Sequence, residues 1–285
     1  MVVTWAKIEQ DARRLNCSIE HLAASLTWDV KARRPPRPQT SPLVEVYREW
    51  ERRAQTALLL LWQQRARRLG ERLRADVKAV DDVLSDRDWW SEWTLAYLGV
   101  VLPLMEQAGA TAADIAIASF LDEYALGLDV ENTMLSVSSW ARRYSGQLAR
   151  GLTQTDKATL RRHLSAWVES SEDMPALIAR VDSFLNNAPR ARRIAVTEAT
   201  RAYAEGHYAA WRESGVVTGV IWTTAADELV CPICRPLDGQ FTALGGQEWR
   251  HFSKPHLDVG LSVAGPPAHP NCRCWTLPWV KELPR

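Results

Sequence analysis

The sequence predicts an α+β protein in which a mostly helical N-terminal body is followed by a small C-terminal module. Three observations lead to this prediction. Apolar residues recur every three or four positions from about Leu43 to Ser214, which is the pattern of helices with one buried face. A short β-branched and aromatic run then occurs at Gly219–Thr224. Four cysteines and one histidine gather in the loops that follow this run, and we expect them to hold those loops.

The helical recurrence is clearest over residues 69–84, where apolar side chains follow one another at intervals of four, four, three and four. The members of this row are Leu69, Leu73, Val77, Val80 and Leu84. The spacing predicts one apolar helix face. The residues expected to separate helices are Gly109, Gly127, Gly151 and Pro175.

Four segments follow from these patterns. Residues 1–30 are expected to be helical, and residues 31–43 form a linker, because four prolines and four bases within twelve positions fit neither a helix nor a packed sheet. Residues 44–188 form a helical domain. Residues 189–285 form a module that contains one long helix (about 189–213), a short antiparallel β unit with a closing strand at about Cys274–Leu277, and long loops.

Composition is that of a soluble globular protein, with 46% apolar and 24% charged residues among 285. The net charge of +1 does not indicate a dedicated nucleic-acid binder, but residues 86–138 hold nine acids and a single base, Arg87. Such a distribution suits a protein that contacts differently charged partners, but solvated helix faces are the favoured interpretation of any single charged run. No signal peptide is visible, and the longest apolar run, Ala57–Trp62, is too short to span a membrane. A reducing cytoplasm is the expected compartment of synthesis.

The cysteines form two groups, Cys231-Pro-Ile-Cys234 and His269-Pro-Asn-Cys272-Arg-Cys274. The Cys-x-x-Cys spacing lets two thiolates reach one tetrahedral ion from a tight turn. Zinc takes four ligands, so the expected set is Cys231, Cys234, Cys272 and either His269 or Cys274, with Zn²⁺ in a structural role. A redox pair, disulfides formed outside the cell and packed thiols remain alternatives, although a βαβ context for redox chemistry is missing.

Catalytic zinc patterns are absent. No histidine is followed two positions later by glutamate, as zinc deaminases require, and no His-Glu-x-x-His occurs. Asp227, Glu228 and Asp238 flank the first cysteine pair, but a structural clamp is favoured and no enzyme is expected. The alternative is a zinc-dependent hydrolase or nuclease, or a toxin-like enzyme, that uses the Cys/His module beside Glu198 and Arg201.

Two further sets of residues are candidates for interactions. Glu198 and Arg201 lie three positions apart on the long helix, which predicts an ion pair across one turn. Basic stretches predict contacts with double-stranded DNA. The candidate DNA-contacting residues are Arg65, Arg68, Arg72, Arg190, Arg192 and Arg193.

A spaced string of residues over about 189–280 resembles the phage Mu F-like minor head protein family, also called phage head morphogenesis proteins. The string includes Thr197-Glu198 on a helix, Cys231-Pro-Ile-Cys234, Leu237-Asp-Gly239 and the terminal Pro266-Pro-Ala-His-Pro-Asn-Cys-Arg-Cys274. Between these motifs stand Ala202, Gly206, Gly215, Trp222 and Asp227. One position departs from the family, which often has arginine where this chain has Val196.

The resemblance implies a minor capsid protein, present in few copies inside the procapsid, that is associated with the portal and needed for head assembly. It implies as partners the portal protein, the major capsid or scaffolding protein and, in a role in packaging, double-stranded DNA, but no membrane. It also implies a place in the virion, at the capsid interior near the portal, and in the host cytoplasm during assembly.

Overall fold

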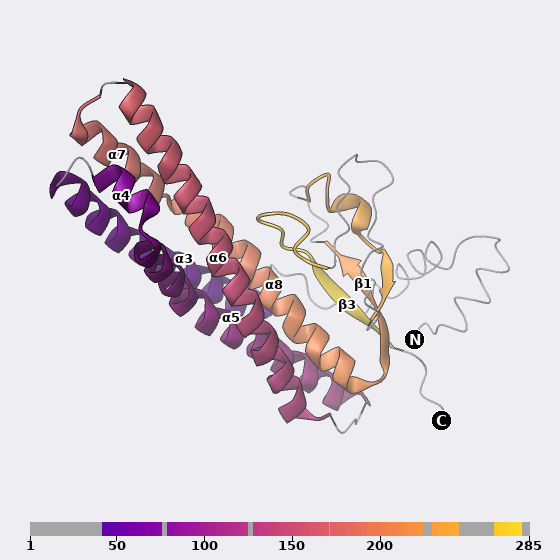
Figure 1. The fold of residues 1–285 in the computed structure, drawn as a ribbon. Coiled ribbons are helices and arrows are strands. Elements are labelled where there is room, and N and C mark those ends of the chain that lie inside the picture. The colour runs from indigo at the N-terminus through magenta and orange to yellow at the C-terminus, as the bar shows by residue number, and fades with distance from the viewer. Residues whose placement is uncertain are drawn as a thin grey trace. The chain divides into compact units, whose positions relative to one another are not determined.

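The computed structural model describes residues 42–75, 79–124, 128–170, 172–224, 230–244 and 265–280. The helices predicted within residues 1–30 and nearly all of the predicted linker lie outside these residues. Figure 1 shows the course of the chain. Its helices are α3 (Pro42–Ala75), α4 (Ala79–Ser85), α5 (Arg87–Tyr124), α6 (Val130–Ser170), α7 (Met174–Leu185) and α8 (Ala188–Ser214). A 3-10 turn, η2 (Arg235–Leu237), and the strands β1 (Val217–Thr223), β2 (Phe241–Ala243) and β3 (Trp275–Val280) follow.

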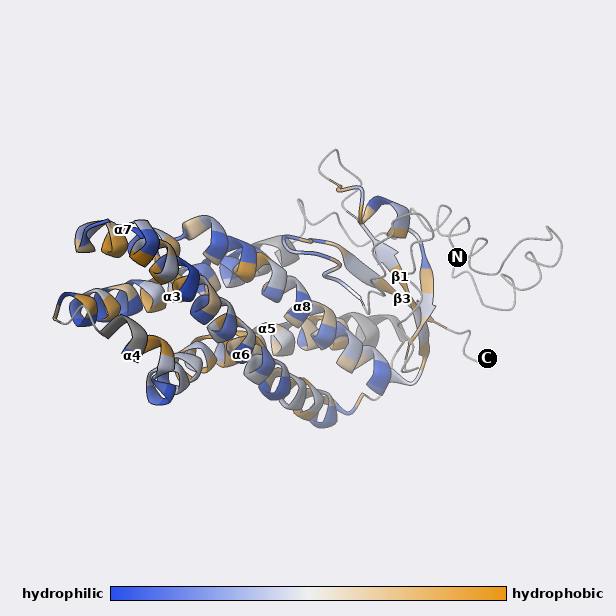
Figure 2. Ribbon diagram, turned by 45° about the horizontal axis from the view of Figure 1, so that its top comes forward, coloured by the Kyte–Doolittle hydropathy of each residue, from blue (hydrophilic) through white to orange (hydrophobic). Residues whose placement is uncertain are grey.

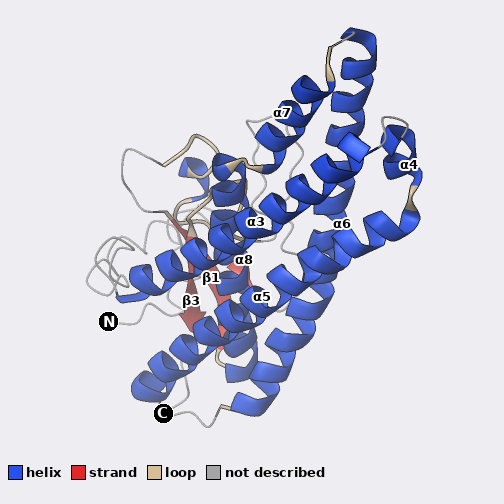
Figure 3. Ribbon diagram, turned by 90° about the vertical axis from the view of Figure 1, so that its left-hand side faces the viewer, coloured by secondary structure: helices blue, strands red, loops and turns tan. Residues whose placement is uncertain are grey.

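The predicted α+β class is confirmed. Helices make up most of the described chain, and strands occur only after α8 (Figure 3). The three strands form one antiparallel sheet in the order β2–β1–β3, in which Ile221 of the central strand pairs with Phe241 on one side and Leu277 on the other. The long C-terminal helix begins and ends within one residue of its predicted limits.

Several predicted helix boundaries were wrong. Gly109 lies inside α5 and Gly151 inside α6, because a long helix tolerates a single glycine at modest cost. Pro175 does mark a helix start, in the first turn of α7, where Asp173 caps the helix by accepting a hydrogen bond from the backbone N–H of Ala176 at 3.0 Å. Gly127 lies outside the described residues.

The apolar row predicted over residues 69–84 belongs to two helices and not to one. Leu69 and Leu73 are buried in α3, which ends at Ala75, and Leu84 is only partly buried in α4, where Val83 provides the core contact. Helical spacing alone did not reveal the break, because both segments bury an apolar side chain every three or four residues.

The described chain divides by contacts into two compact units. One consists of residues 50–107 and 139–195, and the other includes residues 108–138 and those from 196 onward. Helices α3, α5, α6 and α8 each contribute residues to both units. The domain limits predicted from the sequence stay predictions.

The core of the all-helical unit is rich in aromatic side chains. Trp62, Trp93 and Tyr97 are fully buried among leucines of α3, α6 and α7, and Trp89 and Trp90 pack against Trp93 with ring centroids 5.9 and 5.2 Å away. Large rings bury much apolar area with few torsions to fix, so they stabilise a bundle at low entropic cost. Most of the tryptophans of this unit are therefore core residues.

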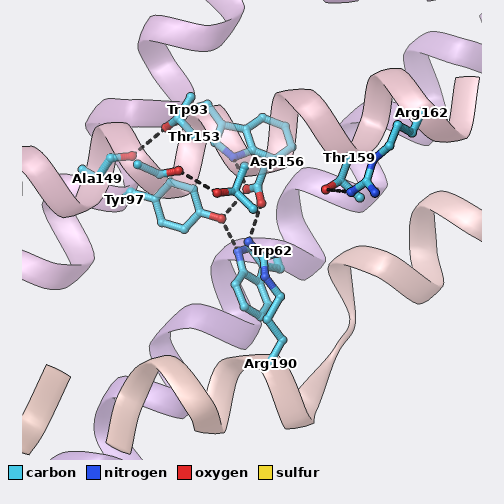
Figure 4. Close-up of polar contacts among 11 residues, drawn as sticks. Trp62, Trp93, Tyr97, Ala149, Thr153, Asp156, Thr159, Arg162 and Arg190 are labelled. Atoms are coloured by element: carbon cyan, nitrogen blue, oxygen red, sulfur yellow. Dashed lines mark hydrogen bonds and ion pairs between the residues drawn. The ribbon is translucent and has the colours of Figure 1, made fainter. Parts of the chain in front are cut away.

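A buried carboxylate joins four helices within this core (Figure 4). Asp156 of α6 accepts hydrogen bonds from Trp93 Nε1 at 2.9 Å and from the Tyr97 hydroxyl, and its second oxygen lies 2.6 Å from the Arg190 guanidinium. Arg190 also stacks on Trp62, with 4.5 Å between its Cζ and the ring centroid. Burial raises the pKa of Asp156, and the positive charge of Arg190 opposes that shift.

The second unit packs its sheet against helices. Val217 and Val220 of β1 lie in a core with Trp211 of α8 and Ile117 of α5. In the same unit α5 and α8 approach so closely that a Cβ atom on Gly206 would lie 2.1 Å from the Gly109 carbonyl oxygen. Glycine at position 206 is therefore required by backbone proximity, which gives this residue of the family string a structural reason.

One described segment, Arg87–Ala118 of α5, is long and apolar enough to cross a membrane by length and composition. Its apolar side chains include the core residues Trp93, Tyr97 and Met105. A core helix of a soluble protein passes the same test, so the segment is weak support for a membrane span.

Candidate metal centre

The first cysteine pair sits in a tight turn. The backbone N–H groups of Cys234 and Arg235 both donate to the Cys231 carbonyl, at 3.1 and 3.0 Å, and the chain continues into η2. The Cys234 N–H also lies 3.3 Å from Cys231 Sγ. This turn brings the two sulfurs to one side, as two ligands of one ion require.

Strand β1 is hydrogen-bonded to the residues that follow this turn. The backbone N–H of Trp222 donates to the Gln240 carbonyl, and the Gly239 N–H donates back to the Trp222 carbonyl, both at 2.8 Å. Asp238 accepts a hydrogen bond from the Thr224 N–H at 2.8 Å, so its carboxylate braces the loop. Trp222 and Leu237 are fully buried against the cysteines and give the centre an apolar floor.

The second group comes from the turn before β3. The Cys272 N–H donates to the His269 carbonyl at 3.1 Å, and Asn271 adopts a left-handed backbone with φ of 63°, which asparagine tolerates well. His269 Nδ1 lies 2.7 Å from the Pro270 carbonyl oxygen, which can only accept. Nδ1 is therefore the donor to this carbonyl, and Nε2 is the ring nitrogen that faces the sulfurs of Cys231 and Cys234.

Five side chains converge as two overlapping groups that share Cys234. One consists of Cys231, Cys234 and His269, and the other of Cys234, Cys272 and Cys274, with all ligand atoms of a group within 4.8 Å of one another. His269 Nε2 lies 3.0 Å from Cys231 Sγ and 3.1 Å from Cys234 Sγ. Cys234 Sγ lies 3.7 Å from Cys272 Sγ. All four cysteines are free thiols.

These three distances are close to those between ligands of one tetrahedral ion, although the five ligand atoms form two groups and not one. Zinc–sulfur bonds of about 2.3 Å and zinc–nitrogen bonds of about 2.0–2.1 Å place two sulfurs about 3.8 Å apart and a sulfur and a nitrogen about 3.5 Å apart. The sulfur pair matches this value, and the sulfur–nitrogen pairs are slightly closer. Three cysteines and one histidine are a donor set that structural zinc sites use. Among the described residues, no carboxylate joins either group.

The close approach of the cysteines shifts the pKa values of Cys272 and Cys234 in opposite directions. Hydrogen bonds from Cys234 and Cys274 hold the pKa of Cys272 well below its usual range, whereas the pKa of Cys234 is raised by its contacts with Cys272 and Cys274 and by burial. One of the neighbouring thiols thus ionises at the expense of the others. A divalent cation relieves this competition, since it stabilises several thiolates together.

Helix α8 holds the histidine–cysteine turn through two threonines. Thr200, which is 2% exposed, donates its hydroxyl to the Cys272 carbonyl at 2.8 Å, and Thr197 Oγ1 accepts the Asn271 N–H at 2.9 Å. Thr197 belongs to the family string. Sequence reasoning did not single out Thr200, because nothing local relates a helical threonine to a carbonyl 72 residues away.

Replacing Thr200 with valine should lower the free energy of unfolding by about 1–3 kcal/mol, because the Cys272 carbonyl stays buried and loses its donor. Urea unfolding followed by tryptophan fluorescence measures the change. Thr155→Val is the matched control, since the exposed Thr155 bonds only to a carbonyl of its own helix. An effect of Thr200→Val no larger than that of the control would show that the bond is not needed.

The predicted Glu198–Arg201 pair has Arg201 Nε 3.2 Å from Glu198 Oε2. Both residues are partly buried on α8. The pair and the two threonines come from the same stretch of α8 that faces the histidine–cysteine turn, which agrees with a structural use of this helix segment.

Most of the candidate DNA-contacting arginines have partners within the protein. Arg65 is 5% exposed and donates to the Glu92 carbonyl at 2.9 Å, and Arg190 holds Asp156. Arg68 and Arg72 face Glu92 and Asp86 at 3.6 and 3.1 Å. Arg192 and Arg193 are exposed on α8.

Comparison with known proteins identifies the C-terminal half. Residues 149–277 match the family model described as Phage Mu protein F like protein. The match covers 129 of the 285 residues, and over them the chain is similar to the Mu F-like family. The resemblance predicted from the sequence is thereby confirmed, although the match begins at residue 149, earlier than the predicted limit of about 189. No curated protein and no solved structure matches the chain.

The Mu F-like region includes the second part of α6, all of α7 and α8, and the sheet as far as the first half of β3. Both cysteine groups and both threonines that hold them lie within it. The similarity to this family points to a part in phage head morphogenesis.

Proposed function

We propose that this chain is a minor head protein of a tailed phage that acts in procapsid assembly at the capsid interior, in contact with the portal and with the major capsid or scaffolding protein. The match over residues 149–277 carries this proposal. That family's proteins are head components, so the specific partners and the position at the portal are inferences from the family and from the resemblance of the motifs.

We infer further that Cys231, Cys234, His269 and Cys272 hold one structural Zn²⁺ ion. The His269 Nε2 atom points between the first two sulfurs, and the sulfur–sulfur distance to Cys272 is that of two ligands on one ion. Cys274, which like Cys272 belongs to the second group, is the alternative to His269 as the fourth ligand. Bound there, the ion would supply a cross-link between the two loops and β1, in a module with a small apolar core.

We propose no enzymatic activity. A catalytic zinc keeps an open position and works beside an acid or base, whereas four protein ligands fill the tetrahedron. Asp238, the one flanking acid that the structure describes, bonds to the Thr224 N–H. Glu198 is paired with Arg201. The hydrolase or nuclease alternative therefore has no feature of the described residues in its favour.

The decisive experiment removes the protein from the assembling phage. Heads made without it are expected to be malformed or poorly filled with DNA, and heads made with it should contain few copies of the chain, as quantified by mass spectrometry. A tagged chain should also retain the portal protein when purified from infected cells. Normal, fully packaged heads made in its absence, with no copy of the chain in ordinary heads, would overturn the proposal.

A further inference from the structure

Helix α6 carries a row of cations, here named the α6 stripe, that consists of Arg143, Arg150, Lys157 and Arg161. They lie seven, seven and four residues apart, so that on a helix of 3.6 residues per turn they share one face. The row extends for about 27 Å along the helix axis. The three arginines are exposed, and the half-buried Lys157 lies against the ring of Trp90, 5.5 Å from its centroid.

Among the residues that the structure describes, none of the three stripe arginines takes part in an ion pair, so their positive charge is not neutralised by a paired carboxylate. Between Glu131 and Glu169, α6 has a single acidic residue, Asp156, which points into the core and is paired with Arg190. The neighbouring Arg142 differs, because Glu106 of α5 lies 3.3 Å from it.

Uncharged polar side chains occupy the positions between the cations. Gln147, Gln154 and Ser165 are exposed on the same face. Much of the α6 ribbon in Figure 2 has the colour of hydrophilic residues. Such side chains donate hydrogen bonds to phosphate oxygens. A protein partner would instead be expected to meet an apolar centre surrounded by polar residues, and the stripe has no apolar centre.

We propose that the α6 stripe binds the phosphate backbone of duplex nucleic acid without reading its sequence. A straight row of cations matches a regular polyanion. Between Arg143 and Arg161, α6 has a single aromatic residue, Tyr144, whose ring stacks on that of Trp140 with centroids 5.4 Å apart, so the stripe lacks the series of rings on which successive unpaired bases stack. The choice of DNA as the natural polyanion rests on the proposed function in a phage head. The stripe is distinct from the arginines that the sequence suggested, of which Arg65 and Arg190 serve the core.

The test compares the full chain with an Arg143→Gln, Arg150→Gln, Arg161→Gln variant. Binding to a fluorescent DNA duplex of about 30 base pairs is measured by anisotropy over a series of salt concentrations, where each phosphate contact contributes about 0.9 to the slope of log K against log salt. The variant is expected to have a slope smaller by about three and an affinity at least tenfold lower at about 0.1 M salt.

The matched control removes three arginines that already face carboxylates. Arg67, Arg180 and Arg212 pair with Glu71, Glu172 and Glu205, and their replacement by glutamine should change the affinity by no more than about twofold. Replacing the three stripe arginines with lysine should preserve the slope. Thermal unfolding of each variant checks that the exposed substitutions leave the fold intact.

An unchanged slope in the stripe variant, or an equal loss in the control, overturns the proposal. Tighter binding of single-stranded DNA or of polyglutamate than of duplex DNA overturns it as well. Detection of the chain in purified heads tests the proposed function separately. A chain that binds duplex DNA through the stripe but is absent from heads would contradict only the proposed function.

Discussion

A chain in which Cys234 is replaced by serine should lose its zinc and most of the order of its C-terminal loops. Cys234 is the residue shared by both ligand groups, and it is 2% exposed. Structural zinc contributes about 10–16 kcal/mol to the folding of zinc-finger peptides. We therefore expect the free energy of unfolding to fall by more than about 4 kcal/mol, which is the range that loss of a metal can reach.

Elemental analysis measures the first effect, with about one zinc per wild-type chain expected for a single four-ligand site and much less in Cys234→Ser. Urea unfolding and hydrogen exchange of β1 measure the second. Cys17→Ser is the control, because Cys17 belongs to neither cysteine group. Cys274→Ser should retain the metal if His269 is the fourth ligand. Wild-type protein without metal, whose unfolding a chelator does not change, would contradict the zinc proposal.

Replacing Asp156 with alanine should lower the free energy of unfolding by about 3–5 kcal/mol, because the partly buried Arg190 guanidinium loses its buried counter-charge. The Trp93 Nε1–H and the Tyr97 hydroxyl lose their acceptor in the same change. Asp156→Asn keeps the shape and one acceptor oxygen, so its effect should be smaller. Asp182→Ala, at an exposed site of α7, should cost no more than about 0.5 kcal/mol.

A double-mutant cycle with Arg190→Ala isolates the interaction. The two alanine variants should be strongly non-additive, with a coupling energy of about 1–3 kcal/mol, since each removes the partner of the other. Additive effects would show that Asp156 and Arg190 stabilise the core independently. Arg190→Ala should destabilise the fold whether or not DNA is present, as expected of a core residue.

Local patterns in the sequence predicted the elements that bury residues periodically. The long helix at 188–214 and the strands β1 and β3 were found because their apolar and β-branched residues recur at helical or strand spacing. Strand β2 was missed, since Phe241–Ala243 is too short for a periodic signal. The division of residues 69–84 between the helices α3 and α4 was missed because the apolar spacing continues from one helix to the next.

The sequence by itself determined the candidate ligand residues of the metal centre and the resemblance to the family. Both depend on residue types at short spacings, which can be read without knowledge of the fold. Only the tertiary structure decided how these residues are used. It placed His269 Nε2 between two sulfurs and Thr200 under the Cys272 carbonyl, and it moved Arg65 and Arg190 from a supposed DNA surface into the core. Such contacts join residues tens of positions apart, so packing selects them and no local pattern encodes them.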